Sequence, residues 1–404
     1  MYFKKDLFIV LLLLCASPLL ALFFVLWHIF LREKEYLYVL AFIMGLLAFL
    51  YPPVSDLSRH AFIYEDAKNM SWEGFNEQFF EKRWDVVIYC IEYLMAKANV
   101  PFEYLRMLLV FIAYCLYFKI YAYIVNILNA KDRKQNFLVF FIFFLSITFF
   151  GITIGLRYNT AIALINFSVY MVLIRNKKVG YFFAILACFV HYALVNLVFV
   201  IFIADKVRFN INKKMLLGLI IISCVMSFVL LETFLSYFPS IRESSEGYIT
   251  GSYAVGGVIE MGRSFKGKVY SYLVSLLPAV CGLFVFMNGS RSKISFYNKI
   301  ILLMIFLTYS IPVLHGRYKT LIIFPTFIYF FLEYFSTSIY KKYVYVFLYM
   351  ALVYQTSQIY TFSPNIVRGK MKYIIAPLPV ILGSTYENKS YIFQNLKSDG
   401  NSYK

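Results

Sequence analysis

Long apolar segments alternate with short polar turns along almost the whole chain. A helix needs about 20 apolar residues to cross a bilayer, and several of these segments reach that length while others fall slightly short of it. The pattern predicts an all-α polytopic integral membrane protein with about 10–12 transmembrane segments. The apolar segments lie at residues 7–31, 36–51, 104–128, 137–154, 158–174, 179–203, 215–231, 269–287, 300–314, 318–335 and 343–360.

Composition supports this class of protein. Of the 404 residues, 61% are hydrophobic and only 15% are charged, so a water-soluble fold would expose a largely apolar surface. The turns between the segments are too short to separate soluble domains. We therefore expect residues 1–404 to form a single transmembrane domain.

The positive charge is concentrated in the short turns. A net charge of +18 could indicate nucleic-acid binding, but such a function needs a basic patch on one soluble face, which this pattern does not provide. Basic turns between spans are typical of cytoplasmic loops. The turns contain Lys131, Arg133 and Lys134; Arg175, Lys177 and Lys178; Lys206, Arg208, Lys213 and Lys214; Arg291, Lys293 and Lys299; and Lys341 and Lys342.

One apolar run, Tyr181 to Ile203, has a basic turn at each end. If both turns are cytoplasmic, the run must enter the membrane and return, as a bent or re-entrant pair of helices with His191 near its tip. The alternative is a straight span that violates the positive-inside rule, which describes a bias and not a strict law.

The same topology places two long polar regions on the external face. Residues 52–103 are expected to form an external loop with an amphipathic helix from Trp84 to Val100. Residues 232–268 are expected to form a large external loop containing Arg263. Its mixed charge, aromatic residues and glycines suit a mobile lid that binds sugars and phosphates, although a merely solvated loop has the same composition.

A short motif, Arg-Tyr-x-Thr, occurs twice. It stands at Arg157-Tyr158 within Gly155–Thr160 and at Arg317-Tyr318 within His315–Thr320, each time at the mouth of an apolar segment. An arginine at bilayer depth costs about 2.5–3.5 kcal/mol, so it usually lines a cavity or binds an anion. We expect both arginines to open a helix and to share one anionic site, whereas simple anchors would extend to the lipid headgroups.

Other candidate residues lie outside this motif. After Pro52 and Pro53, the residues Asp56, Arg59 and His60 fall in one local turn, which could supply a base and an anion ligand or could form an ordinary solvated ion pair. His191, within an apolar run, is either a catalytic base or a core side chain. The sequence shows no Gly-rich phosphate loop, His-Glu-x-x-His motif or nucleophile elbow, and no metal site or cofactor is expected.

With these residues in this order, the chain resembles a family of integral-membrane polysaccharide polymerases, the Wzy-type polymerases and especially the EpsG-like ones. The resemblance rests on Asp56-Leu57-x-Arg59 after the second segment, on Arg157-Tyr158 opening a helix with Ala161 and Ala163, on the basic turn and His191 that follow, and more loosely on Arg317. It implies a GT-C-like, metal-independent glycosyltransferase of the bacterial inner membrane, with its active site facing the periplasm or exterior.

The resemblance also implies a reaction and a set of partners. One undecaprenyl-diphosphate-linked glycan would be transferred to another, releasing undecaprenyl diphosphate and building O-antigen, capsule or exopolysaccharide. Besides the bilayer, a flippase and a chain-length regulator would be partners. Arg157, Arg317, His191 and Asp56 would be catalytic, and the substrate would be bound by Arg59, Tyr158, Arg263, His315 and Tyr318.

Two other functions use similar residues. An O-antigen ligase takes the same donor but a lipid A–core acceptor. A transporter or flippase for lipid-linked oligosaccharide would use arginines as clamps in an alternating-access cavity, but many transporters contain a repeat of whole helical bundles, and none is visible here.

Overall fold

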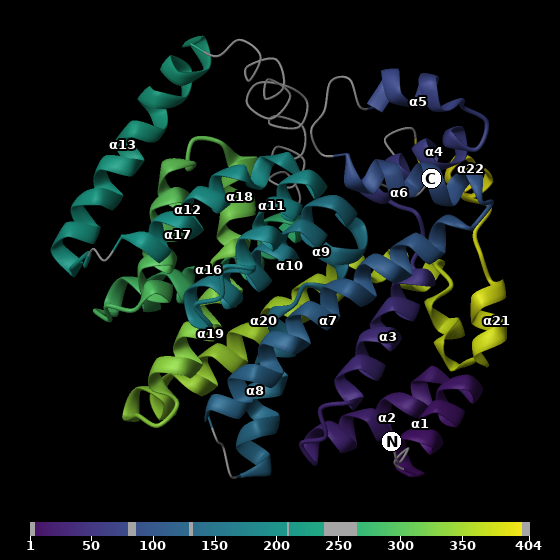
Figure 1. Ribbon diagram of the computed structural model, residues 1–404, viewed down its shortest axis with the longest axis horizontal. Coiled ribbons are helices and arrows are strands. Elements are labelled where there is room, and N and C mark those ends of the chain that lie inside the picture. Colours follow the sequence, from purple (N-terminus) through teal and green to yellow (C-terminus); the bar gives the residue numbers. More distant parts are fainter. Residues whose placement is uncertain (1–4, 80–85, 129–131, 208–209, 238–264, 398–404) are drawn as a thin grey trace.

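The computed structural model describes residues 5–79, 86–128, 132–207, 210–237 and 265–397, and this part of the chain is helical without any strand (Figure 1). In the first half the helices are α1 (Lys5–Ala16), α2 (Pro18–Phe30), α3 (Tyr36–Phe49), α4 (Asp56–Ala67), α5 (Trp72–Phe79), α6 (Val87–Lys97), α7 (Phe102–Leu128), α8 (Arg133–Ser146), α9 (Phe149–Ile154), α10 (Leu156–Val169), η1 (Tyr170–Ile174), α11 (Gly180–Val190), η2 (Tyr192–Leu194) and α12 (Val195–Lys206). They are followed by α13 (Lys213–Tyr237), α16 (Phe265–Met287), α17 (Lys293–Leu307), α18 (Pro312–Leu321), α19 (Ile323–Tyr334), α20 (Ser338–Arg368), η3 (Met371–Ile375), α21 (Leu378–Gly383) and α22 (Asn388–Asn395).

The all-α membrane class is confirmed, since each predicted apolar segment lies on one helix or on two or three consecutive helices. Three helices among the described residues are long and apolar enough to cross a membrane: α7, α10 continued by η1, and α16. Shorter apolar helices include α1, α2, α3 and α11. The number of segments that cross the bilayer stays a prediction.

Several segments differ from the predicted spans because the helix is interrupted. The first apolar segment breaks at Ser17, which is extended, before Pro18 begins α2; proline at the first position of a helix loses no hydrogen bond. The segment 137–154 is broken between Ser146 and Phe149. Helix α13 continues to Tyr237, so the predicted 232–268 loop begins inside a helix, and its Arg263 lies outside the described residues.

The predicted hairpin over Tyr181–Ile203 is confirmed. Helix α11 ends at Val190, His191 is extended, and α12 returns the chain to its starting end. The Tyr181 hydroxyl donates to Asp205 Oδ2 over 2.9 Å, whereas a straight helix would separate residues 24 positions apart by about 36 Å. Lys293 joins the same end, with Nζ lying 2.7 Å from Asp205 Oδ1 and 2.8 Å from Asn176 Oδ1.

One basic residue that was predicted to lie in a turn is buried within a helix. Lys299 lies inside α17 and is only 2% exposed, and its Nζ donates to the carbonyl of Ile211 over 2.8 Å. Burial is possible because this carbonyl satisfies the ammonium group. Lys299 therefore fastens the start of α13 to α17.

Between residue 52 and the start of α7, the described residues form the helices α4, α5 and α6, and α22 packs against α4 (Figure 1). An ion pair between Lys389 Nζ and Asp66 Oδ1, 2.6 Å long, joins these elements. The amphipathic helix predicted at 84–100 is present as α6, but its Glu92 points inward and is fully buried. The predicted external loop is thus a small helical cap.

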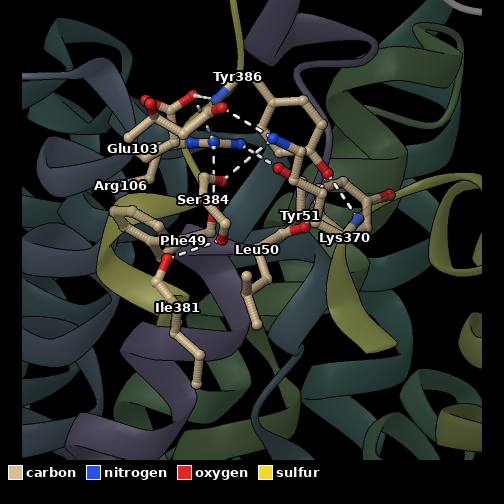
Figure 2. A network of polar contacts seen from close by, with 10 residues as sticks. Phe49, Leu50, Tyr51, Glu103, Arg106, Lys370, Ile381, Ser384 and Tyr386 are labelled. Carbon is tan, nitrogen blue, oxygen red and sulfur yellow. Dashed lines mark hydrogen bonds and ion pairs between the residues drawn. The ribbon is translucent and has the colours of Figure 1, made fainter. Parts of the chain in front are cut away.

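A buried polar network ties the C-terminal segment to this end of the bundle (Figure 2). The fully buried Arg106 donates to the carbonyl of Tyr51, and its Nη2 lies 3.6 Å from Glu103 Oε1. The same carboxylate oxygen accepts from the backbone N–H of Tyr386 over 2.9 Å, and the Tyr386 hydroxyl donates to the carbonyl of Leu50 over 2.9 Å. The network therefore locks residue 386 between the end of α3 and the start of α7.

Candidate functional site

Arg157 is positioned by a break between two helices. Helix α9 ends at Ile154, and α10 begins at Leu156, so Arg157 is its second residue and opens a helix as predicted. The Asn159 side chain stabilises the break by donating to the carbonyl of Gly151 over 2.7 Å. The lack of a Cβ at Gly155 makes room for this side chain, because a Cβ at this position would lie 2.6 Å from Asn159 Nδ2 and the amide would have to shift.

Arg317 is positioned differently from the prediction. It does not open a helix, because α18 already begins at Pro312, where a proline suits the first helical position. Helix α17 ends at Leu307, and the Nδ1 atom of His315 lies 2.9 Å from the carbonyl oxygen of Ile305, one of the last carbonyls of α17. His315 therefore fastens α18 to the end of α17.

Tyr158 directly follows Arg157 in the chain, and its ring contacts both Arg317 and His191. The guanidinium carbon of Arg317 lies 4.8 Å from the centre of the Tyr158 ring, within the range of a cation–π contact. The ring of His191, at the tip of the hairpin, meets Tyr158 edge to face at 5.4 Å. Because Tyr158 directly follows Arg157, three of the four predicted catalytic residues lie around one short backbone segment.

Arg157 has its own aromatic support. Its guanidinium carbon lies 4.9 Å from the centre of the Tyr89 ring on α6. Tyr89 in turn contacts the ring of His60 on α4, with 6.2 Å between ring centres. The His60 Nδ1 atom is 2.6 Å from Glu92 Oε1, and both side chains are almost completely buried. The helical cap of α4 and α6 and the membrane bundle thus meet at Arg157.

The sequence reasoning missed Tyr89 and Glu92 as members of this group. The available signal was a glutamate three residues after a tyrosine on an otherwise apolar face, a spacing that places both on one side of a helix. It was interpreted as the polar face of an amphipathic helix.

The remaining predicted residues lie around this group or apart from it. Asp56 accepts a hydrogen bond from Arg59, and the two side chains are 37% and 59% exposed. This ion pair is the polar contact that Asp56 makes within the described residues, and it does not include His191 or Arg157. The Tyr318 hydroxyl accepts a hydrogen bond from Asn196, which ties α18 to the returning arm of the hairpin.

The chemistry that this arrangement supports is anion binding. A guanidinium held over an aromatic ring presents a planar fork of N–H groups, which can bind phosphate oxygens in pairs. Within the described residues, no group of three or more His, Cys, Asp and Glu side chains could hold a metal ion. The expected absence of a cofactor stays a prediction.

The fold and this group of residues define an all-α membrane protein in which one arginine at a helix break and a second within α18 each lie over a tyrosine ring. The chain belongs to the EpsG family, whose model matches residues 36–374, and it is thus a polysaccharide-related membrane protein. The match includes Asp56, Arg157, His191 and Arg317. No curated protein and no solved structure shows significant similarity to the chain.

Proposed function

We propose that this protein is a GT-C-like membrane glycosyltransferase that polymerises undecaprenyl-diphosphate-linked oligosaccharide repeat units into a surface polysaccharide. The observation that carries the proposal is the convergence of Arg317, from within α18, on Tyr158 and His191, which lie with Arg157 at helix interruptions. Membership of the EpsG family supports a role in polysaccharide synthesis.

The reaction needs a cation where the leaving group separates. An acceptor hydroxyl attacks the anomeric carbon of the donor, the bond from that carbon to the diphosphate oxygen breaks, and undecaprenyl diphosphate leaves with the electron pair. Negative charge therefore grows on the diphosphate, and Arg157 and Arg317 stabilise it more strongly in the transition state than in the ground state.

The hydroxyl proton needs an acceptor. His191 is the better candidate, because its ring lies against Tyr158 and thus beside Arg317. Asp56 is second, since its carboxylate is engaged by Arg59 in an exposed position. The substrate would further contact Tyr158, Tyr318 and His315, with Arg59 and Arg263 binding the glycan or its phosphates.

The proposed setting is the bacterial inner membrane, with the site open to the periplasm or exterior. A flippase would supply both donor and acceptor glycans, and a chain-length regulator would limit the product. The five basic turns, expected on the cytoplasmic side, support this orientation.

The first test is the glycan profile of a deletion strain. Single repeat units on the final acceptor indicate a lost polymerase and support the proposal. Long polymer that remains unattached indicates a ligase, and repeat units trapped in the cytoplasm indicate a flippase; either result overturns it.

The second test measures polymer formation by purified protein in liposomes supplied with a synthetic lipid-linked repeat unit. Arg157→Ala and Arg317→Ala should each lower the rate about 100- to 1,000-fold, as the loss of one oxyanion donor does. Lysine should restore little activity, because it lacks the planar two-point fork.

Arg175 provides the matched control, since its guanidinium carbon lies 5.0 Å from the centre of the Tyr123 ring in a predicted cytoplasmic turn. Arg175→Ala should keep the wild-type rate. Wild-type chain length in Arg157→Lys or Arg317→Lys, at equal abundance, would remove that arginine from the site.

A further inference from the structure

The contacts of the two arginines repeat one arrangement. Arg317 lies over Tyr158, which meets His191, and Arg157 lies over Tyr89, which meets His60. The two arrangements differ at the histidine. At His60 the structure shows a carboxylate partner, Glu92, whose Oε1 lies 2.6 Å from His60 Nδ1, whereas the described contacts of His191 are with aromatic rings.

The His60–Glu92 pair is buried to an unusual degree. The residues are 2% and 0% exposed, so neither side chain reaches a substrate directly. The second carboxylate oxygen, Glu92 Oε2, is also buried and has no hydrogen-bond partner among the described residues. A buried carboxylate with an unsatisfied oxygen is a poor way to stabilise a core, since apolar side chains of similar volume usually serve equally well. This cost in stability suggests that the His60–Glu92 pair serves to position neighbouring side chains.

The geometry connects the pair to Arg157. Glu92 and Tyr89 are three residues apart on α6, so they share one face of the helix. The bond from Glu92 to His60 fixes that face of α6 against α4, and the Tyr89 ring is further held by Phe79, stacked at 5.4 Å. Because Arg157 lies 4.9 Å from the centre of this ring, the orientation of the ring determines where the guanidinium can lie.

We propose that His60 and Glu92 form a positioning pair that holds Tyr89, and through it Arg157, in the orientation that binds the diphosphate of a prenyl diphosphate. The Nδ1–H of His60 donates to Glu92, and neither residue touches the ligand. The identity of the ligand rests on the proposed function, but the role of the pair does not require polymerisation to occur.

The test measures binding of farnesyl diphosphate to the full-length protein in nanodiscs, with inorganic pyrophosphate as competitor. Tyr89→Leu should weaken binding about 2- to 30-fold, the range expected for a lost cation–π contact. Glu92→Leu removes the acceptor for His60 and should weaken binding within the same range. Glu92→Gln keeps a carbonyl oxygen for His60 Nδ1–H and should restore the affinity to within about threefold of wild type.

Glu103→Gln is the matched control for a loss of stability. Glu103 is equally buried, but its partners are Arg106 and Tyr386 in the network of Figure 2. This variant should lower the unfolding temperature and leave farnesyl diphosphate binding unchanged.

Three results would overturn the proposal. Wild-type binding by Glu92→Leu, while Arg157→Ala binds poorly, would show that Arg157 is positioned without the pair. Equal losses in Glu92→Gln and Glu92→Leu would show that the charge of Glu92 matters and not its geometry. No displacement of farnesyl diphosphate by pyrophosphate would show that the diphosphate is not recognised. If the variants behave as expected but the wild-type protein forms no polymer, the proposed function fails and the positioning pair stands.

Discussion

Gly155→Ala offers a sharp test of the helix break that positions Arg157. An ideal Cβ at residue 155 would lie 2.6 Å from Asn159 Nδ2 and 3.2 Å from the carbonyl oxygen of Gly151. Since the first distance is shorter than real contacts allow, the Asn159 amide must move and give up its 2.7 Å bond to Gly151. The lost bond and the unsatisfied amide together should cost about 1–3 kcal/mol of folding stability.

The effect on activity should be larger than the effect on stability. Arg157 lies two residues after the break, and a misplacement of about 1 Å at a reacting centre can cost about 100-fold in rate. We therefore expect polymer formation by Gly155→Ala to fall about 10- to 100-fold. The assay is the rate of polymer formation in liposomes, corrected for the folded fraction measured by thermal unfolding.

Asn159→Ala, alone and combined with Gly155→Ala, measures how much of the cost comes from the Asn159 side chain. Asn159→Ala should cost only about 0.5–1.5 kcal/mol, and Gly155→Ala combined with Asn159→Ala should be little worse, because the clash is gone. Gly316→Ala is the matched control, since a Cβ there meets nothing within 4 Å and alanine favours the interior of α18. Wild-type rate and stability in Gly155→Ala, or strictly additive costs in the double variant, would refute the reasoning.

Three other predictions follow from the fold. Single cysteines placed after Arg175 and at Lys213 should react with a membrane-impermeant maleimide only from the cytoplasmic side, because the Tyr181–Asp205 bond closes the hairpin; labelling from opposite sides would contradict that orientation. Arg106→Met should lower stability by about 3–5 kcal/mol, because Glu103 is left buried without its partner, and it should expose the segment around Tyr386 to protease; unchanged melting and cleavage would show that the network is dispensable. Polymer formation should continue in EDTA, because the described residues offer no cluster for a metal; loss of activity that added Mg²⁺ restores would show the opposite.

The sequence predicted those parts of the fold that depend on the positions of basic turns or on the lengths of apolar segments. Basic turns on both sides of Tyr181–Ile203 require the chain to return, and α11 and α12 do so. The apolar lengths required an all-α membrane protein. The repeated Arg-Tyr motif drew attention to Tyr158 and Arg317, and the Arg317 guanidinium carbon lies 4.8 Å from the centre of the Tyr158 ring. That both arginines share one anionic site stays a prediction.

The parts that were missed depend on contacts between distant residues. His60 and Glu92 are 32 positions apart, and no local pattern pairs them. Arg317 was predicted to open a helix, yet it lies inside α18, because the helix begins at Pro312 and His315 and Tyr318 find partners on neighbouring helices. The helix break at Ser17 similarly depends on how the surrounding bundle packs.

The adjacency of Arg157 and Tyr158 in the chain has a mechanical consequence. One residue carries the first guanidinium, and the next supplies the ring under the second, so a rotation of the first turn of α10 moves both cations together. A lipid headgroup that displaces Arg157 on binding therefore also shifts the Tyr158 ring, on which the Arg317 guanidinium lies. Such a linkage would let the arrival of one lipid-linked glycan be felt where the other is held, without any moving domain.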